Sequence, residues 1–341
     1  MAKAVTLSDI AERVGVSTVT VSKALSGQKG VSEEMRQRII ALAEEMGYSR
    51  VSSAKMKPVQ TESYNIGVLI REMYLGKYNS FYLSMYQLLA ACAVERGSFT
   101  LMEVISRDMV ESNSMPKLVQ ERKVDGLIVL GGISQSYISY LKEHVKIPTV
   151  FLDFIGEDLG EDYVISDSFY GGYYLTKYLF SKGHQKIANV GTVGATSSIT
   201  QRYLGYEMAL LEHGQKVKKE WVIDDRYLES GEVDEALMVL PQDMPTAFFC
   251  NCDMTASRFA KVLEAAGYRI PEDVSIVGYD NYLLPGSYEI GITTYEIDMK
   301  GMSERSIALL EKKLRGKRVH PGVSIVTGHF VEKESVREIR T

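Results

Sequence analysis

A run of short polar side chains near the N-terminus has the residue types that DNA reading requires. Ser17, Thr18 and Ser22 carry hydroxyl groups, and between and beside them lie an apolar Val19 and a cationic Lys23. Short hydroxyl side chains allow close approach to phosphates and to base edges, where lysine adds a positive charge. A generic three-helix bundle is the alternative, but it does not explain why a helix carries hydroxyls here rather than long charged side chains. We therefore predict that this run contacts DNA.

Three short helices are expected to position this run. Thr6 is followed three residues later by an acid, which is close to a capping box and indicates the start of a first helix. Gly15 supplies a left-handed turn, and Ser17 caps a second helix over residues 18–25. Apolar residues at helical spacing predict a third helix over 33–46. Two short helices across a tight glycine turn, braced by a third, form a helix-turn-helix.

The charge of the chain is divided unevenly, although the total of −5 at pH 7 is acidic. Residues 1–57 hold nine Lys and Arg against six Asp and Glu, which gives +3 and leaves −8 for the remainder. A basic N-terminal segment followed by an acidic remainder is what we expect if only the N-terminal part contacts DNA phosphates.

Three cysteines, Cys92, Cys250 and Cys252, cannot all pair within the chain, which fits a reducing compartment. The Cys250-x-Cys252 pair has no nearby Cys or His to complete a zinc site, so we expect no metal. No apolar run approaches the length of a membrane span, and no secretory signal is visible. We therefore expect a cytoplasmic protein without metal or cofactor.

From residue 64 onward, short apolar runs alternate with amphipathic helical stretches such as 80–97 and 254–267. The strand-like runs are 65–70, 99–105, 125–131, 148–154, 186–192, 246–251 and 274–280. Continuous apolar strands separated by helices indicate parallel sheets covered on both faces, so we predict an α/β body of doubly wound parallel sheets. Ligands in such folds bind outside the carboxyl ends of the strands. Those ends are Asn79–Tyr82, Leu130–Ser134, Asp153–Gly156, Gly191–Arg202, Asn251–Asp253 and Asp280–Tyr282.

The common catalytic motifs are missing from the body. The sequence holds no G-x-G-x-x-G opening a helix, no G-x-x-x-x-G-K-[ST] and no G-x-S-x-G. No nucleophile is paired with a base, so we predict that the chain is not an enzyme. Two alternatives stay open: a solute-binding receptor, and a sugar-metabolising enzyme with an accessory DNA-binding domain. The helix-turn-helix and the missing secretory signal count against the receptor, and the lack of a catalytic constellation counts against the enzyme.

The N-terminal segments VTLSDIAERVGVSTVTVSKALSG and VSEEMRQRIIALAEEMGYS resemble the opening of regulators of the lactose/galactose-repressor family. The family pattern V-T-x-x-D-[IV]-A-x-x-[AV]-G-V-S-x-x-T-V-S-[RK]-x-L-x-G is matched at nearly every position. The resemblance implies that Thr18, Val19 and Lys23 read bases. Lys23 stands where many relatives have Arg. An arginine there would contact guanine through two parallel hydrogen bonds, whereas the lysine ammonium provides a single point charge. The side chains expected to hold backbone phosphates are Thr6, Ser17, Thr20 and Ser22.

The linker over residues 49–63 matches the family pattern less closely. In the family this segment forms a short hinge helix that wedges paired leucines into the minor groove. Here Arg50 occupies the usual proline site and Lys57 occupies the leucine site. Lys55 replaces the usual arginine, and Met56 is the nearest apolar side chain for insertion, so these two are the predicted hinge contacts. A disordered basic tether that adds only electrostatic affinity is the alternative.

The body also resembles this family in order along the chain, in segments such as KVDGLIVLG, KIPTVFLDF, KGHQKIANVG and AAGYRIPEDVSIVGYDN. The resemblance implies the two-lobed architecture of periplasmic sugar-binding proteins, with an effector between lobes whose binding alters their closure. The expected organisation is a helix-turn-helix domain over 1–48, a linker over 49–63 and a core over 64–341. Within the core, the N-lobe is about 64–165 plus 296–324, and the C-lobe is about 166–295 plus 325–341.

The predicted effector site combines carboxylates, a guanidinium, a hydroxyl and aromatic rings. Its residues, from the resemblance and from the strand-end loops, are Phe81, Tyr82, Asp153, Ser198, Arg202, Tyr227, Asp253 and Asp280. Asp280 and Arg202 match positions that grip the same ligand in relatives, and Asp153 matches a polar contact on the N-lobe. Carboxylates and a guanidinium form charge-assisted bonds with hydroxyls, while an aromatic ring covers an apolar ring face. Thr196 and Ser198 fill positions where a purine-binding relative has Arg and Thr, which disfavours a purine.

Together these features predict a repressor of carbohydrate-utilisation genes under the control of a small effector, most simply a mono- or oligosaccharide. A homodimer is expected, because a two-fold protein symmetry matches a palindromic double-stranded DNA operator.

Overall fold

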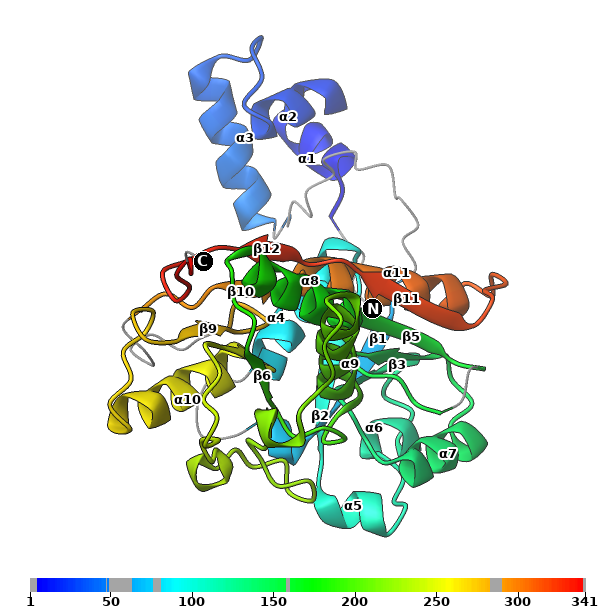
Figure 1. Ribbon diagram of the computed structural model, residues 1–341. Helices are drawn as coiled ribbons and strands as arrows, with labels where there is room; N and C mark the ends of the chain where they lie inside the picture. The colour runs from blue at the N-terminus through cyan, green and yellow to red at the C-terminus, as the bar shows by residue number, and fades with distance from the viewer. Residues whose placement is uncertain are drawn as a thin grey trace. The chain divides into compact units, whose positions relative to one another are not determined.

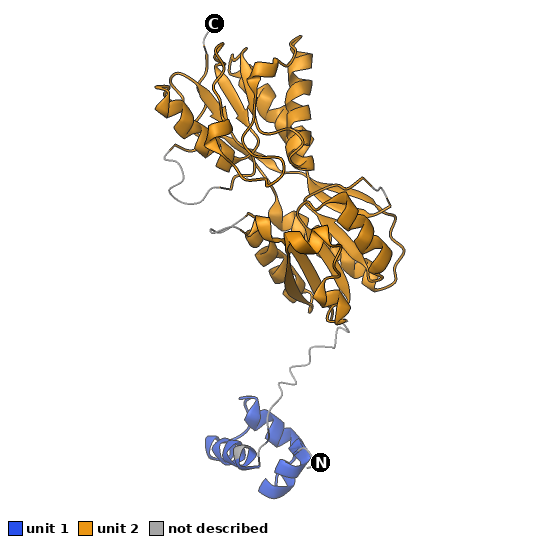
Figure 2. Cartoon of the chain, turned by 90° about the horizontal axis from the view of Figure 1, so that it is seen from below, with its two compact units in different colours: residues 1–61 blue, residues 62–341 orange. Residues whose placement is uncertain are grey.

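The computed structural model describes residues 5–46, 48, 63–75, 81–157, 160–282 and 290–339. The chain divides into two compact units, residues 1–61 and 62–341, which are blue and orange in Figure 2. The predicted hinge contacts Lys55 and Met56 lie outside the described residues. None of the described helices is both long and apolar enough to cross a membrane.

The N-terminal unit is built from α1 (Leu7–Val14), α2 (Thr18–Leu25) and α3 (Glu33–Glu45), shown in blue in Figure 1. Thr6 and Asp9 form the predicted capping box, and Gly15 ends α1 at a left-handed φ of 77°. Ser17 caps α2 by accepting a hydrogen bond of 3.1 Å from the Thr20 N–H. One fully buried side chain from each helix closes the core: Ile10, Val21 and Ile39.

The C-terminal unit contains two parallel sheets and one antiparallel strand pair. The larger sheet has the order β11-β5-β4-β3-β1-β2, and the smaller has the order β7-β6-β8-β9. The antiparallel pair joins β10 to β12. In chain order the strands are β1 (Asn65–Arg71), β2 (Phe99–Ile105), β3 (Gly126–Leu130), β4 (Thr149–Leu152), β5 (Asp162–Ser166), β6 (Ile187–Val190), β7 (Val222–Ile223), β8 (Ala247–Cys250), β9 (Ser275–Val277), β10 (Thr294–Glu296), β11 (Gly322–Val326) and β12 (His329–Val331). These are the doubly wound parallel sheets that the sequence predicts.

Helices cover both faces of each sheet. They are α4 (Phe81–Glu95), α5 (Arg107–Glu111), α6 (Lys117–Gln120), α7 (Gln135–His144), α8 (Ser168–Ser181), α9 (Ser197–Glu212), α10 (Asp253–Ala265) and α11 (Met299–Leu314), with 3-10 turns at η1 (Glu72–Tyr74), η2 (Lys219–Trp221) and η3 (Glu235–Leu237). On the larger sheet, α4 and α11 pack on one face and α7 on the other. On the smaller sheet, α8 and α9 pack on one face and α10 on the other. We call the larger sheet with its helices the first lobe. The smaller sheet with its helices and the β10–β12 pair is the second lobe.

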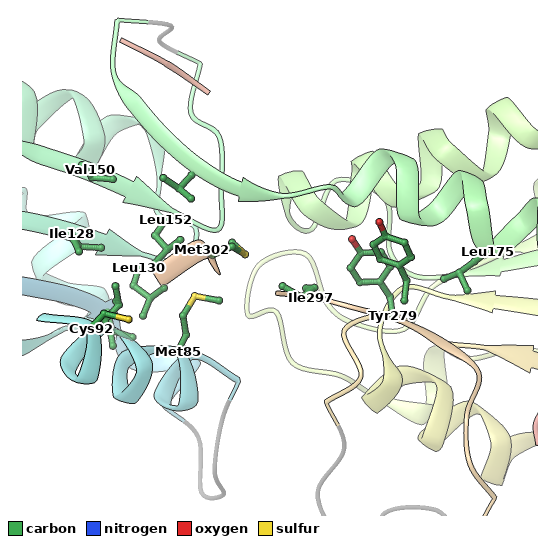
Figure 3. Packing of buried hydrophobic residues seen from close by; sticks show 14 of the residues in the cluster. Met85, Cys92, Ile128, Leu130, Val150, Leu152, Leu175, Tyr279, Ile297 and Met302 are labelled. Carbon is green, nitrogen blue, oxygen red and sulfur yellow. The ribbon is translucent and has the colours of Figure 1, made fainter. Parts of the chain in front are cut away.

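The alternation of side chains along β1 explains why both of its faces are buried. Ile66, Val68 and Ile70 join the cluster under α4 and α11, whereas Leu69 joins the cluster under α7. Figure 3 shows part of the first cluster, where the α4 residues Met85 and Cys92 and the α11 residue Met302 approach Ile128, Leu130, Val150 and Leu152. Because the strands are packed between helices on both faces, the loops at their carboxyl ends are held in fixed positions.

Glycines let α8 and α9 approach closely in the second lobe. A Cβ on Gly205 of α9 would collide with the carbonyl oxygen of Phe169, and a Cβ on Gly172 of α8 would collide with that of Arg202. Larger side chains at either position would push the helices apart. This contact therefore fixes the helix that carries Arg202.

Candidate DNA-binding and effector sites

Helix α2 presents the predicted DNA-reading side chains at its surface. Ser17, Thr18, Val19, Ser22 and Lys23 are exposed, Thr20 is half-buried, and Thr6 is exposed at the start of α1. Val19 exposes 61% of its surface, whereas Val21 on the same helix is fully buried. An exposed valine suits apolar contact with a thymine methyl group.

Arg36 of α3 anchors the C-terminal end of α2, and sequence reasoning did not identify it. Its Nη1 donates to the Ala24 carbonyl at 2.8 Å, and its Nη2 donates to the Gln28 carbonyl at 2.8 Å. A cation at this end satisfies carbonyl groups that the helix leaves without partners and opposes the negative end of its dipole. Arg36 therefore holds α2 in its orientation without itself being a predicted DNA contact.

Two aspartates of the effector site follow strands that belong to different lobes. Asp153 comes directly after β4 in the first lobe, and Asp280 comes after β9 in the second. Both have a left-handed backbone, with φ of 67° at Asp153 and 92° at Asp280. For residues other than glycine this backbone conformation is strained, and such strained residues are often found at ligand sites. The strained backbones of Asp153 and Asp280 lie at the strand ends where the two lobes meet.

Arg202 of α9 places a buried positive charge close to these carboxylates. Its Nη1 donates to the Asn251 carbonyl at 2.7 Å, and its guanidinium carbon lies 3.8 Å from the centre of the Tyr279 ring. Its buried Nε has no hydrogen-bond partner in the described part of the chain. A buried guanidinium N–H without an acceptor carries an energetic penalty that a ligand oxygen would remove.

Burial raises the pKa of all three aspartates in the cluster. The pKa of Asp153 rises to about 6, because burial outweighs the opposing effects of Arg202 and the Tyr82 hydroxyl. The pKa of Asp280 rises to about 7, again because burial outweighs Arg202. Burial and the nearby Asp280 carboxyl hold the pKa of Asp253, the first residue of α10, well above its usual range. The predicted residue Asp253 therefore lies inside the cluster.

Aromatic residues of α4 form one wall of the cluster. The Tyr82 hydroxyl donates to Asp153 at 2.9 Å, and the Tyr82 ring centre lies 4.4 Å from that of Tyr74. The Phe81 ring meets the Tyr282 ring edge-on, with ring centres 5.7 Å apart. Because Tyr282 follows Asp280 in the second lobe, the start of α4 contacts both lobes.

Ser198 lies on the second-lobe side of a small cavity between the lobes. The cavity has a volume of about 10 Å³, and Asp153, Ser197 and Ser198 are among its lining residues. The Ile155 N–H also donates across it to the Ser197 hydroxyl at 3.4 Å. About 10–15 Å³ accommodates one water molecule and no sugar, so a sugar enters here only if the lobes separate.

Tyr227 is the predicted effector residue that the structure does not bring to this cluster. It exposes 47% of its surface, and its hydroxyl donates to Asp234 at 2.8 Å. Its neighbour Arg226 faces the interior instead.

A buried ion pair next to the cluster was missed from the sequence. Arg226 contacts Asp225 at 2.7 Å, and Asp225 also accepts from the Asn251 amide at 2.7 Å and from the Thr255 hydroxyl at 2.6 Å. Burial alone would raise the pKa of Asp225, but the Arg226 charge and these hydrogen bonds lower it to about 2. The backbone carbonyl of Asn251 accepts a hydrogen bond from Arg202, so this network helps to hold Arg202 in place within the effector cluster.

Known proteins match the two parts of the chain separately and together. A family model described as "Bacterial regulatory proteins, lacI family" matches residues 6–50, and one described as "Periplasmic binding protein-like domain" matches residues 176–336. The chain is 26% identical over 336 residues to the HTH-type transcriptional repressor PurR of Photobacterium profundum, with 98% of this chain and 99% of the relative covered. The chain therefore joins a DNA-binding segment that matches the lacI-family model to a periplasmic-binding-protein-like segment, and it is similar over nearly its full length to a transcriptional repressor. It is thus a DNA-binding transcriptional regulator and not an enzyme.

Solved structures share the fold of this chain over nearly its full length. The transcriptional regulator CelR in complex with cellobiose is 22% identical with a TM-score of 0.70, covering 97% of this chain and 99% of that one. A lac repressor dimer bound to operator and the anti-inducer ONPF is 23% identical with a TM-score of 0.67, covering 98% of this chain and 100% of that one.

We expect Asp225→Asn to lower the free energy of unfolding by about 2–4 kcal/mol at pH 7, because it leaves the buried Arg226 without its partner. The pKa of Asp225 is lowered from 3.8 to about 2 on folding, so its contribution is present above about pH 4 and is lost as the pH falls towards 2. Urea unfolding of parent and variant at pH 7, 4 and 3 measures the difference in their free energies of unfolding, which should become smaller as the pH falls. The exposed neighbour supplies the control Asp224→Asn, which should stay within about 0.5 kcal/mol of the parent. An equal loss at pH 7 and pH 3 would contradict this assignment.

Proposed function

We propose that this chain is a cytoplasmic, homodimeric repressor whose binding to a palindromic operator is controlled by a sugar held between the two lobes. The observation that carries the proposal is the buried Arg202 guanidinium, whose Nε has no acceptor among the described residues and which lies near aspartates of both lobes. In this proposal residues 1–48 read the operator, residues 49–63 link them to the core, and residues 64–341 bind the effector.

The chemistry of the cluster favours a hydroxyl-rich, uncharged effector. Sugar hydroxyls accept hydrogen bonds from a guanidinium and donate to carboxylates, and both kinds of bond are charge-assisted. The carboxyl groups of Asp153 and Asp280 lie near Arg202, Lys333 acts on Asp253, and the nearby Arg226 is paired with Asp225. The cations near the cluster are thus matched by carboxyl groups, which suits a ligand without a charge of its own. The rings of Phe81 and Tyr82 offer the apolar surface that covers a sugar ring face.

One comparison favours a sugar over a purine, because the structurally similar CelR is in complex with cellobiose. A thermal-shift screen of the full chain against mono- and oligosaccharides, with purine bases as the second panel, tests this choice. Stabilisation by purines alone would refute the sugar proposal.

An exposed apolar surface in the first lobe supports the homodimer. Edge strand β2 exposes Phe99 (58%), Met102 (39%) and Val104 (42%), and Val94 on the adjacent α4 is 59% exposed. Exposed apolar residues along an unpaired strand edge are typical of an association surface. The similar lac repressor structure is that of a dimer bound to operator.

Lys23→Ala should weaken specific operator binding with little effect on the fold, because Lys23 is exposed on the recognition helix. We expect the ratio of operator to random-DNA affinity to fall by about 5- to 150-fold, as expected when a base contact worth about 1–3 kcal/mol is lost. Fluorescence anisotropy at fixed salt measures both affinities. Lys29→Ala, an exposed lysine outside α2, is the matched control and should leave the ratio unchanged. A variant at Lys23 that discriminates as well as the parent would show that Lys23 does not read bases.

Asp280→Asn should weaken the effector response while operator binding survives. The substitution keeps the size of the side chain but removes a carboxylate that is largely ionised at pH 8, above its pKa of about 7, and that then strengthens hydrogen bonds to sugar hydroxyls. At pH 8 we therefore expect at least a tenfold rise in the half-effective sugar concentration, equivalent to about 1.4 kcal/mol. A gel-shift titration of operator complexes with the sugar found in the screen measures it. Asp224→Asn, which changes an exposed carboxylate, should respond as the parent does. An unchanged dose-response for Asp280→Asn would remove Asp280 from the site.

A further inference from the structure

A second, larger cavity opens at the β11 edge of the six-stranded sheet. Its volume is about 270 Å³, and it is lined by residues of α11, of the loop after α11 and of β11, together with Asp162 of β5. None of the predicted effector residues lines it. A cavity of this size is close to the lower end of the range of about 300–1,000 Å³ for small-molecule sites.

The segment that forms this cavity is the most basic part of an acidic body. Residues 312–331 contain five Lys and Arg and no Asp or Glu. Two of these cations are already paired with carboxylates: Lys313 contacts Asp162 at 2.7 Å, and Arg315 contacts Glu311 at 3.9 Å. Asp162, the acidic residue of the lining, is therefore already neutralised and does not cancel the charge of the cavity.

Three cationic side chains of the lining have no carboxylate partner within the residues that the structure describes. They are Arg305, Lys312 and Arg318; Arg305 donates its Nε to the Ser324 hydroxyl at 3.3 Å, which turns it towards β11. Arg305 and Lys312 lie seven residues apart on α11 and so share a face, about 10 Å apart along the helix axis. Arg318 approaches from the following loop, and His320 adds ring nitrogens to the same wall.

The floor between the charges is apolar. Ala308 and Leu309 lie between Arg305 and Lys312 on α11, and Val319 and Val323 face them from the loop and strand. Cations separated by this distance around an apolar floor match a ligand whose negative groups stand at the two ends of a short carbon frame. A single inorganic ion would leave the floor and one of the cations unused.

We propose that this cavity binds a small organic polyanion with two or more phosphate groups, as a second ligand site separate from the effector cluster. Arginine and lysine provide the charge-assisted bonds to the phosphates, and the apolar floor receives the carbon frame. The cations of the effector cluster are matched by carboxyl groups, so that cluster lacks the surplus positive charge that such a ligand needs, and the two sites differ in the class of molecule they accept. The site thus goes beyond the proposed sugar response and gives the regulator a second chemical input.

Isothermal titration calorimetry of the full chain with hexane-1,6-diol bisphosphate, a bisphosphate with one phosphate at each end of a carbon chain, tests the proposal at constant ionic strength, with inorganic phosphate as the comparison ligand. We expect saturable binding of the bisphosphate and weaker binding of phosphate. The double variant Lys312→Gln/Arg318→Gln should weaken the bisphosphate at least about tenfold, as expected when two charged bonds are lost. Lys317→Gln, a cation in the same segment that does not line the cavity, is the matched control and should bind as the parent does.

Because the changed side chains are exposed, both variants should retain the circular dichroism and melting temperature of the parent. Absence of bisphosphate binding to the parent would overturn the proposal, as would equal affinity in the parent and the double variant. Loss of binding in Arg202→Gln with retention in the double variant would place the anion in the effector cluster and also overturn it. A double variant that loses operator affinity while it binds the bisphosphate as the parent does would assign these cations to DNA phosphates instead.

Discussion

The buried charge of Arg202 is the constraint on which the arrangement of the C-terminal unit depends. Burying a guanidinium is strongly unfavourable unless hydrogen bonds and opposite charges compensate it, and here the Asn251 carbonyl, the Tyr279 ring and two aspartates do so. The glycine contact between α8 and α9 fixes the helix, and the Asp225–Arg226 pair supports Asn251. The strained backbones of Asp153 and Asp280 are tolerated because they bring the carboxylates to this charge.

This arrangement offers a physical route from ligand to DNA. A ligand shifts a conformational equilibrium only if it interacts differently with the two states. In our proposal, a sugar that bonds Asp153 in one lobe and Arg202 and Asp280 in the other has different contacts in open and closed lobes. The small volume between Asp153 and Ser198 requires that the lobes move when the sugar enters or leaves. Lobe closure is then the property through which the sugar acts on the DNA-binding residues.

The sequence was sufficient for features that depend on local patterns. The capping box at Thr6 and the left-handed Gly15 follow from short-range residue preferences, so the helices of the N-terminal unit appear as predicted. Asp153 and Asp280 follow from the strand-end rule and the family resemblance. Strand β7 has two residues and strands β10 and β12 have three each, and none of them lies in a long apolar run like the one that predicts the equally short β9. Edge strand β11 alternates in burial and so lacks a continuous apolar run. Because β7 is not recognisable from the sequence, the pair Asp225–Arg226 shortly after it is missed as well.

The Nε–H group of Arg202 reports most directly on the proposed effector site, since it is buried without an acceptor in the described part of the chain. Nuclear magnetic resonance of the chain labelled with ¹⁵N-arginine follows this group, and Arg202→Lys assigns its signal. If Arg202 binds the effector, saturation with the sugar that changes operator affinity shifts the Arg202 Nε–H signal and slows its exchange with water, because a sugar oxygen then accepts the hydrogen bond. A sugar that changes operator affinity while the Arg202 signal stays unchanged would contradict the proposed site.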